Sequence, residues 1–149
     1  MSSKGKTRVL IIEDNTPLVL FIVHALTRAG CDVETARTGK RALELVSESR
    51  FDLIALDIKL PDANGFEICS EIKQRHISRK TPIVFVSASS REEDRRRSFT
   101  LGAVDYITKP FEVTDFIFRI VLHAKVKSVK SNIPDKGTDS NIQSLCDTP

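Results

Sequence analysis

The chain has 149 residues, of which 40% are hydrophobic and 29% are charged, and its formal net charge is +3. This composition is typical of soluble globular proteins, and the length allows one domain with its own core. So small a basic excess does not indicate a nucleic-acid-binding protein, and no apolar run approaches the roughly 20 residues of a membrane span. We expect a cytoplasmic protein with no direct nucleic-acid or membrane partner.

Five short strand-like segments alternate with segments of helical periodicity along the chain. Residues 9–12 and 53–56 are continuous apolar runs, whereas residues 32–36 alternate in polarity like a half-buried edge strand. The predicted strands comprise residues 9–12, 32–36, 53–56, 83–87 and 104–107. The predicted helices comprise residues 17–29, 40–49, 66–75 and 113–127, with a fourth helix that opens at Ser90 and stops at Leu101. This alternation predicts right-handed βαβ units and therefore an α/β fold with a doubly wound five-stranded parallel sheet.

Local sequence patterns also predict where helices start and where the domain ends. Thr16 precedes Pro17 and is predicted to cap the first helix, and the segment from Ser90 to Glu93 matches a capping box. Residues 128–149 are polar and show hardly any apolar periodicity. We therefore expect a domain at residues 8–127, followed by a disordered tail or linker.

Polar side chains gather where the predicted strands end. Glu13 and Asp14 follow the first strand, Asp57 follows the third, Ser87 ends the fourth and Lys109 comes just after the fifth. In such sheets, ligands bind at the carboxyl edge of the strands. Three converging carboxylates favour a hard cation, Mg²⁺ or Mn²⁺, while the lysine and the hydroxyl suit the oxygens of a phosphoryl group on a carboxylate nucleophile. The pattern predicts a phosphoryl-transfer site.

Several motifs together resemble the response-regulator receiver domain of two-component signalling, which has a flavodoxin-like (βα)5 fold. They are the acidic pair Glu13-Asp14, residues 56–61 with Gly65, Ser87-Ala88, and residues 106–111 from Tyr106 to Phe111. The resemblance spans about Arg8 to Lys127, and the motifs are highly specific in this order and spacing.

The resemblance implies a role for each residue near the acceptor. Asp57 would accept a phosphoryl group from a phosphohistidine on a histidine kinase or a histidine phosphotransfer protein. Asp14, Asp57 and the backbone carbonyl of Lys59 would bind Mg²⁺ directly, and Glu13 would act largely through water. The domain would catalyse its own phosphorylation and dephosphorylation only, so it would not be an enzyme acting on other substrates.

The resemblance also implies a conformational switch. Lys109 would pair with the phosphoryl oxygens, Ser87 would move to donate a hydrogen bond to them, and the ring of Tyr106 would turn inward as Ser87 shifts. A downstream effector protein or domain would bind the surface formed by the fourth helix, the fifth strand and the fifth helix, where a phosphorylation-linked dimer is also possible.

Each of these residues has a purely structural interpretation beside the functional one. Asp57, Glu13 and Asp14 could cap helices or turns, Ser87 could be a strand-end hydroxyl, Lys109 a solvated lysine, and Tyr106 an ordinary packed aromatic. The first predicted helix carries apolar residues on every side, which indicates either a docking surface for a kinase or scattered surface hydrophobics.

Three other functions remain open from the residues. The chain could be the receiver fragment of a larger multidomain enzyme, such as a hybrid histidine kinase or a nucleotide cyclase. It could be a degenerate receiver that serves only as a scaffold, although its acidic, hydroxyl and lysine residues are complete. A flavodoxin-like cofactor binder is disfavoured because no loop has the composition of a phosphate cradle.

Overall fold

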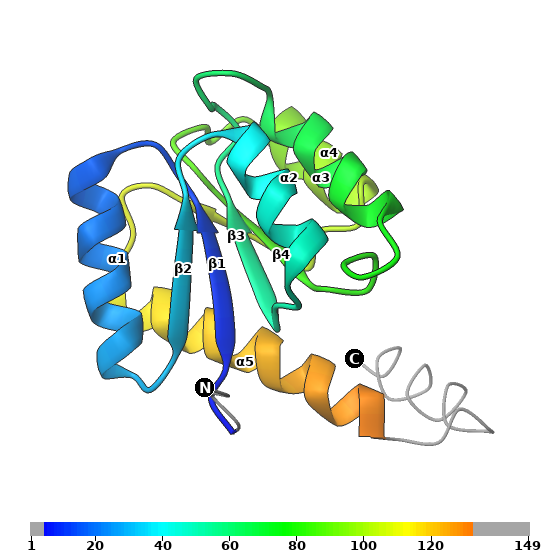
Figure 1. The fold of residues 1–149 in the computed structure, drawn as a ribbon. Coiled ribbons are helices and arrows are strands. Elements are labelled where there is room, and N and C mark those ends of the chain that lie inside the picture. The colour runs from blue at the N-terminus through cyan, green and yellow to red at the C-terminus, as the bar shows by residue number, and fades with distance from the viewer. Residues whose placement is uncertain (1–4, 133–149) are drawn as a thin grey trace, which may run out of the picture.

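The computed structural model describes residues 5–132 and has the predicted α/β fold (Figure 1). The sheet consists of β1 (Arg8–Ile12), β2 (Asp32–Ala36), β3 (Leu53–Leu56), β4 (Ile83–Ser87) and β5 (Asp105–Thr108), all parallel and in the order β2-β1-β3-β4-β5. The helices are α1 (Thr16–Arg28), α2 (Gly39–Glu48), α3 (Gly65–Gln74), α4 (Glu92–Thr100) and α5 (Val113–Asn132). The prediction of a doubly wound, flavodoxin-like sheet is confirmed.

The sheet is buried between two apolar layers. Figure 1 shows α1 and α5 on one face and α2, α3 and α4 on the other. Along β1 the side chains alternate, so that Val9 and Ile11 pack towards Ile22 of α1 and Ile120 of α5. Leu10 and Ile12 lie in the opposite layer with α2 and α3. Apolar runs without alternation thus became strands covered on both faces.

The register of the strands determines which residues meet at the carboxyl edge of the sheet. Ile12 of β1 pairs with Leu56 of β3 and with Ala36 of β2. The residues that follow these two strand ends, Glu13 and Asp57, therefore leave the sheet side by side.

Two predicted helix caps were wrong. Asn15, not Thr16, caps α1, because its side-chain oxygen accepts a hydrogen bond from the backbone N–H of Leu18 at 3.0 Å. Thr16 is already the first residue of the helix. The predicted capping box at Ser90 does not form, because α4 starts at Glu92 with Arg91 as a cap residue that makes no side-chain cap hydrogen bond.

The C-terminal helix is longer than predicted. Helix α5 continues to Asn132, past the domain end that we expected at Lys127, so residues 128–132 belong to the helix and not to the tail. The remainder of the predicted tail, residues 133–149, lies outside the described residues. Within residues 5–132, no helix combines the length and the apolar character that crossing a bilayer requires.

Helix α1 presents apolar side chains to the solvent, as its sequence predicted. Val19, Ile22 and Leu26 are buried against the sheet, whereas Leu20 and Phe21 are 62% and 50% exposed. The exposed apolar side chains that the sequence predicted on α1 are therefore present in the structure. Their use as a kinase-docking surface stays a prediction.

Candidate functional site

Three carboxylates meet at the carboxyl edge of the sheet. The backbone N–H of Asp57 donates to the carbonyl of Ile12 at 3.1 Å, which continues the pairing of β1 and β3 past their last residues. One carboxylate oxygen from each of Glu13, Asp14 and Asp57 lies within 4.8 Å of the other two. Glu13 and Asp57 are buried and Asp14 is exposed, so the cluster opens towards solvent on one side.

This donor set fits a hard divalent cation. All three side chains offer oxygen, and none offers the sulfur or imidazole nitrogen that softer metals prefer. The spacing also brings together negative charges that would repel one another without a compensating cation. Lys59, whose backbone carbonyl we predicted as a further ligand, lies in the loop after Asp57 and lines the adjoining pocket.

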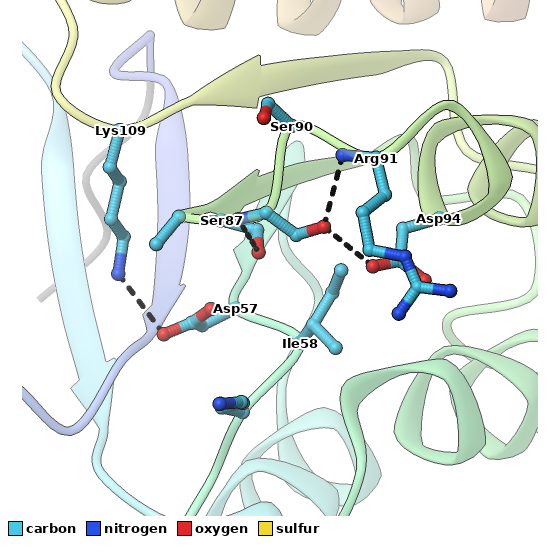
Figure 2. A pocket seen from close by; sticks show the side chains of 10 residues that line it. Asp57, Ile58, Ser87, Ser90, Arg91, Asp94 and Lys109 are labelled. Atoms are coloured by element: carbon cyan, nitrogen blue, oxygen red, sulfur yellow. Dashed lines mark hydrogen bonds and ion pairs between the residues drawn. The ribbon is translucent and has the colours of Figure 1, made fainter.

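Lys109 supplies a positive charge to two of these carboxylates. Its ammonium group donates to Glu13 Oε1 at 2.7 Å and to Asp57 Oδ2 at 3.1 Å. The main chain positions the side chain, since the N–H of Lys109 donates to the carbonyl of Ser87 at 2.8 Å. Figure 2 shows Lys109 reaching across the rim to Asp57.

The pKa values of the two partners show how this charge cluster is balanced. Burial raises the pKa of the Glu13 carboxyl, and the charge of Asp57 adds to this effect, although the hydrogen bond from Lys109 opposes it. Burial by itself would lower the pKa of Lys109, but the hydrogen bonds and charges of Glu13 and Asp57 outweigh it and raise that pKa. Lys109 is therefore held firmly in its charged form.

The loop after Asp57 folds back tightly on the acceptor. The N–H of Gly65 donates to the carbonyl of Ile58 at 2.6 Å, and Lys59 forms an antiparallel bridge with Asn64. A Cβ atom at Gly65 would lie 2.1 Å from the carbonyl oxygen of Asp57, which no side chain tolerates. A glycine at this position thus lets α3 start directly beside the acceptor.

The same loop also caps a neighbouring helix through Asp62, a contact that sequence reasoning missed. Its two carboxylate oxygens accept hydrogen bonds from the N–H groups of Gly39 and Lys40, at 2.8 and 3.0 Å, in the first turn of α2. These hydrogen bonds lower the pKa of Asp62. They complement the cap that Thr38 provides to the N–H of Arg41 at 3.0 Å.

Hydroxyl groups form the other side of the rim. Ser87 is buried at the end of β4, and its Oγ accepts a hydrogen bond from the N–H of Ser89 at 3.1 Å. Tyr106 of β5 is 2% exposed, and its hydroxyl donates to the carbonyl of Ser89 at 2.7 Å. The ring of Tyr106 stacks on Phe85 with centroids 6.5 Å apart. Tyr106 is thus in an inward position in this structure.

A pocket of about 430 Å³ lies between these two sides of the rim (Figure 2). Asp57, Ser87 and Lys109 converge on it, and Asp94 of α4 lies on its far side. The remaining lining residues are Ile58, Lys59, Ala88, Ser89, Ser90 and Arg91. The arrangement has a carboxylate that can act as a nucleophile, a fixed cation and a hydroxyl donor around one cavity, which suits the transfer of a phosphoryl group.

The structure brings the predicted site residues together at one edge of the sheet. Glu13, Asp14, Asp57 and Lys109 form one cluster, and Ser87 borders the same pocket. Tyr106 does not line this pocket and reaches it only through Ser89. The chemical roles of these residues remain predictions. Sequence reasoning missed Asp62 and Asp94, since no motif signals a side chain that contacts a loop or helix elsewhere in the chain.

Comparison with known proteins matches residues 9–121 to a family described as the response regulator receiver domain. The response regulator ArlR of Staphylococcus saprophyticus is 37% identical over 131 residues, which cover 88% of this chain and 58% of ArlR. YrkP of Bacillus subtilis, described as an uncharacterized transcriptional regulatory protein, is 39% identical over 114 residues, which cover 76% of this chain and 48% of YrkP. The chain thus spans about half the length of these curated relatives.

Solved structures agree with this match. A CheY-like response regulator receiver domain protein from Methanospirillum hungatei superposes with a TM-score of 0.78 at 28% identity, covering 85% of this chain and 99% of the other. The non-phosphorylated HemR receiver domain from Leptospira biflexa gives a TM-score of 0.74 at 34% identity, covering 80% of this chain and 94% of the other.

Proposed function

Because the chain belongs to the response-regulator receiver domain family, we propose that Asp57 is its phosphoryl acceptor and that the phosphorylated form signals through a change of conformation. The observation that carries this proposal is the position of Asp57. Its buried carboxylate borders an open pocket, beside a fixed ammonium group and near a hydroxyl. The acid has the surroundings of a nucleophile and not those of a helix cap.

The transfer itself is a displacement at phosphorus. A carboxylate oxygen of Asp57 forms the new O–P bond while the N–P bond of a phosphohistidine breaks, and the histidine nitrogen keeps the electron pair. Lys109 stabilises the negative charge on the phosphoryl oxygens, and the hydroxyl of Ser87 donates to one of them. We predicted that the ring of Tyr106 turns inward as Ser87 shifts. Tyr106 already lies inward in this structure, with its hydroxyl donating to the carbonyl of Ser89, so phosphorylation would stabilise this inward position.

A divalent cation completes this site in the proposal. Asp14, Asp57 and the backbone carbonyl of Lys59 would hold Mg²⁺ directly, and Glu13 would contribute largely through water; Mn²⁺ can serve as well. The bound cation would neutralise charge that develops on the phosphoryl oxygens. The convergence of three carboxylates supports this assignment.

The partners follow from the two-component chemistry. A histidine kinase or a histidine phosphotransfer protein donates the phosphoryl group, and a downstream effector protein or domain reads the switched state, with a phosphorylation-linked dimer as one possible output. The domain acts as a switch and processes no other substrate. We further propose that it works in the cytoplasm and that residues 5–132 do not contact nucleic acid directly.

The test is phosphorylation of the full chain by acetyl phosphate with Mg²⁺, read by intact mass. We expect the wild type to gain one phosphoryl group only when Mg²⁺ is present, and Asp57→Asn to gain none. Glu48→Gln is the matched control, because it neutralises an exposed acid at the C-terminal end of α2. This variant should be phosphorylated normally. Phosphorylation of Asp57→Asn at the wild-type level would refute the acceptor assignment.

A folded wild type that gains no phosphoryl group would favour the scaffold alternative. The matches to response regulators do not favour the fragment of a hybrid histidine kinase or a nucleotide cyclase.

A further inference from the structure

Ser89 connects both switch side chains to helix α4. Its N–H donates to Ser87 Oγ at 3.1 Å, and its carbonyl accepts from the hydroxyl of Tyr106 at 2.7 Å. Its own hydroxyl donates to Asp94 Oδ2 at 2.6 Å and accepts from the N–H of Arg91 at 3.3 Å. One loop residue therefore connects the start of α4 to both Ser87 and Tyr106 through hydrogen bonds.

Asp94 differs from the two acids that precede it in the first turn of α4. Glu92 pairs with Arg96 at 3.9 Å and Glu93 pairs with Arg91, and all four of these side chains are at least 70% exposed. Asp94 is half-buried and turns towards the pocket, where Figure 2 shows it opposite Asp57. Its contact with the Ser89 side chain joins the loop to a helix whose Arg91 cap residue makes no side-chain cap hydrogen bond.

The link has a direct consequence for the chemistry of Ser87. A serine hydroxyl has one hydrogen to donate and two lone pairs that accept. The N–H of Ser89 occupies one lone pair, so the hydroxyl hydrogen of Ser87 stays free to donate towards a group on Asp57. The hydrogen bond from the N–H of Ser89 is thus compatible with a donor role for Ser87, and the hydroxyl of the same Ser89 is bonded to Asp94.

We propose that Asp94 is a positioning residue that acts through Ser89 to keep Ser87 ready to donate and Tyr106 inward. This proposal rests on the proposed function, because it assumes that the inward arrangement is the one that binds phosphoryl oxygens best. Loss of the Ser89–Asp94 hydrogen bond shifts the equilibrium towards arrangements in which Tyr106 is more exposed. The site then binds a phosphoryl group more weakly, since part of the binding free energy is spent on restoring the inward arrangement.

The chain offers a specific optical probe for this test. It contains one tyrosine and no tryptophan, so its intrinsic fluorescence reports Tyr106 alone. We would measure acrylamide quenching of Tyr106 in the full chain, and then the half-saturation concentration of beryllofluoride, a phosphoryl mimic, in the presence of Mg²⁺. The variants are Asp94→Ala, which removes the acceptor, and Asp94→Asn, which keeps an oxygen that can accept from Ser89.

The two variants remove the same charge, so any effect of charge on the helix or on the pocket is equal in both. Asp94→Ala should increase the quenching of Tyr106 and raise the beryllofluoride half-saturation concentration roughly tenfold, as expected for the loss of one hydrogen bond to a carboxylate. Asp94→Asn should remain near the control Glu92→Ala, which loses an exposed acid of the same helix turn. Equal behaviour of Asp94→Ala and Asp94→Asn would overturn the proposal.

A second pair of variants tests the other partner of the same hydrogen bond, should Asp94→Ala fail to fold. Ser89→Ala should reproduce the increased quenching, whereas Ser89→Thr, which keeps a hydroxyl, should not. Quenching at the wild-type level in Ser89→Ala would overturn the proposal. The quenching measurement needs no phosphoryl mimic, so a wild type that fails to bind beryllofluoride would refute the proposed function and leave the positioning role to be decided by quenching.

Discussion

The rim of the pocket has two sides that are held together by different forces. The acidic side consists of Glu13, Asp14, Asp57 and Lys109, and the hydroxyl side consists of Ser87, Ser89, Asp94 and Tyr106. The acidic side is held by ion pairs between the partly buried Lys109 and two buried carboxylates, and by a loop that closes on the backbone of Asp57. The hydroxyl side is held by single hydrogen bonds, most of which pass through Ser89.

This difference suggests which side can move. Buried charges need their partners in place, because an unpaired buried charge costs several kcal/mol. The hydrogen bonds of the hydroxyl side contribute about 1 kcal/mol net each between neutral groups and about 1.5–3 kcal/mol for the bond to the Asp94 carboxylate, and their groups can exchange one partner for another. The acidic side is therefore suited to hold a charged group in a constant position, and the hydroxyl side is suited to change its arrangement when that group arrives.

The largest expected effect is on the acidic side, where Gly65→Ala places a Cβ atom 2.1 Å from the carbonyl oxygen of Asp57. The start of α3 or the backbone of Asp57 must move, so we expect the free energy of unfolding to fall by about 3 kcal/mol or more. Urea unfolding followed by circular dichroism measures it. Gly39→Ala is the control, because it also changes the first residue of a helix but meets mainly the movable tip of Ile68.

Equal stability losses in the two glycine variants would mean that the loop beside Asp57 is not tightly packed, and the contrast between the two sides would weaken.

Lys109→Met should have the next largest effect. It removes the cation from between Glu13 and Asp57, which are 3% and 7% exposed, so we expect the free energy of unfolding to fall by about 2 kcal/mol at neutral pH without divalent cations. Adding Mg²⁺ should reduce the deficit, because a bound cation compensates the same carboxylates. Lys125→Met, at an exposed position on α5, should be neutral. A variant as stable as the wild type would show that the ion pairs do not hold this side.

Tyr106→Phe tests the hydroxyl side. The ring keeps its stacking on Phe85, but the carbonyl of Ser89 loses its donor, and we expect a loss of about 1 kcal/mol in the free energy of unfolding. Ser90→Ala, which removes an exposed hydroxyl from the same loop, should have no effect. A loss in Tyr106→Phe as large as that in Lys109→Met would contradict the view that the hydroxyl side is the weakly held one.

The smallest expected effect comes from Asp62, whose carboxylate joins the loop after Asp57 to the first turn of α2, and this effect depends on pH. The pKa of Asp62 is lowered in the folded protein, so its contribution to stability is present above its unfolded pKa of about 3.9 and is lost as the pH falls through the lowered folded value. Asp62→Asn should therefore melt at a lower temperature than the wild type at pH 7, and the difference should shrink at about pH 3. Thermal unfolding of both proteins at the two pH values tests this.

Glu48→Gln serves as the control in these melts, because its exposed carboxylate lies at the other end of α2. A melting-temperature deficit in Asp62→Asn that stays constant between the two pH values would show that the carboxylate charge does not cap the helix.

The sequence alone predicted the sheet and the place of the site. The segments 32–36 and 83–87 coincide with β2 and β4. The first alternates in polarity, as expected of a half-buried strand at the edge of the sheet, and the second is a mainly apolar run, as expected of an interior strand. The meeting of Glu13 and Asp57 also followed from the sequence, since each comes directly after a strand and parallel strands end at the same edge.

Only the tertiary structure decided which side chains hold the loops. Asn15 caps α1 in place of Thr16, Asp62 caps α2 from the loop after β3, and Asp94 holds Ser89 where we had predicted a capping box at Ser90. The hydrophobic periodicity of a sequence indicates which face of a helix or strand is buried. It does not indicate where a loop passes a neighbouring helix or strand. A hydrogen bond between the loop and its neighbour depends on that path to within a fraction of an ångström.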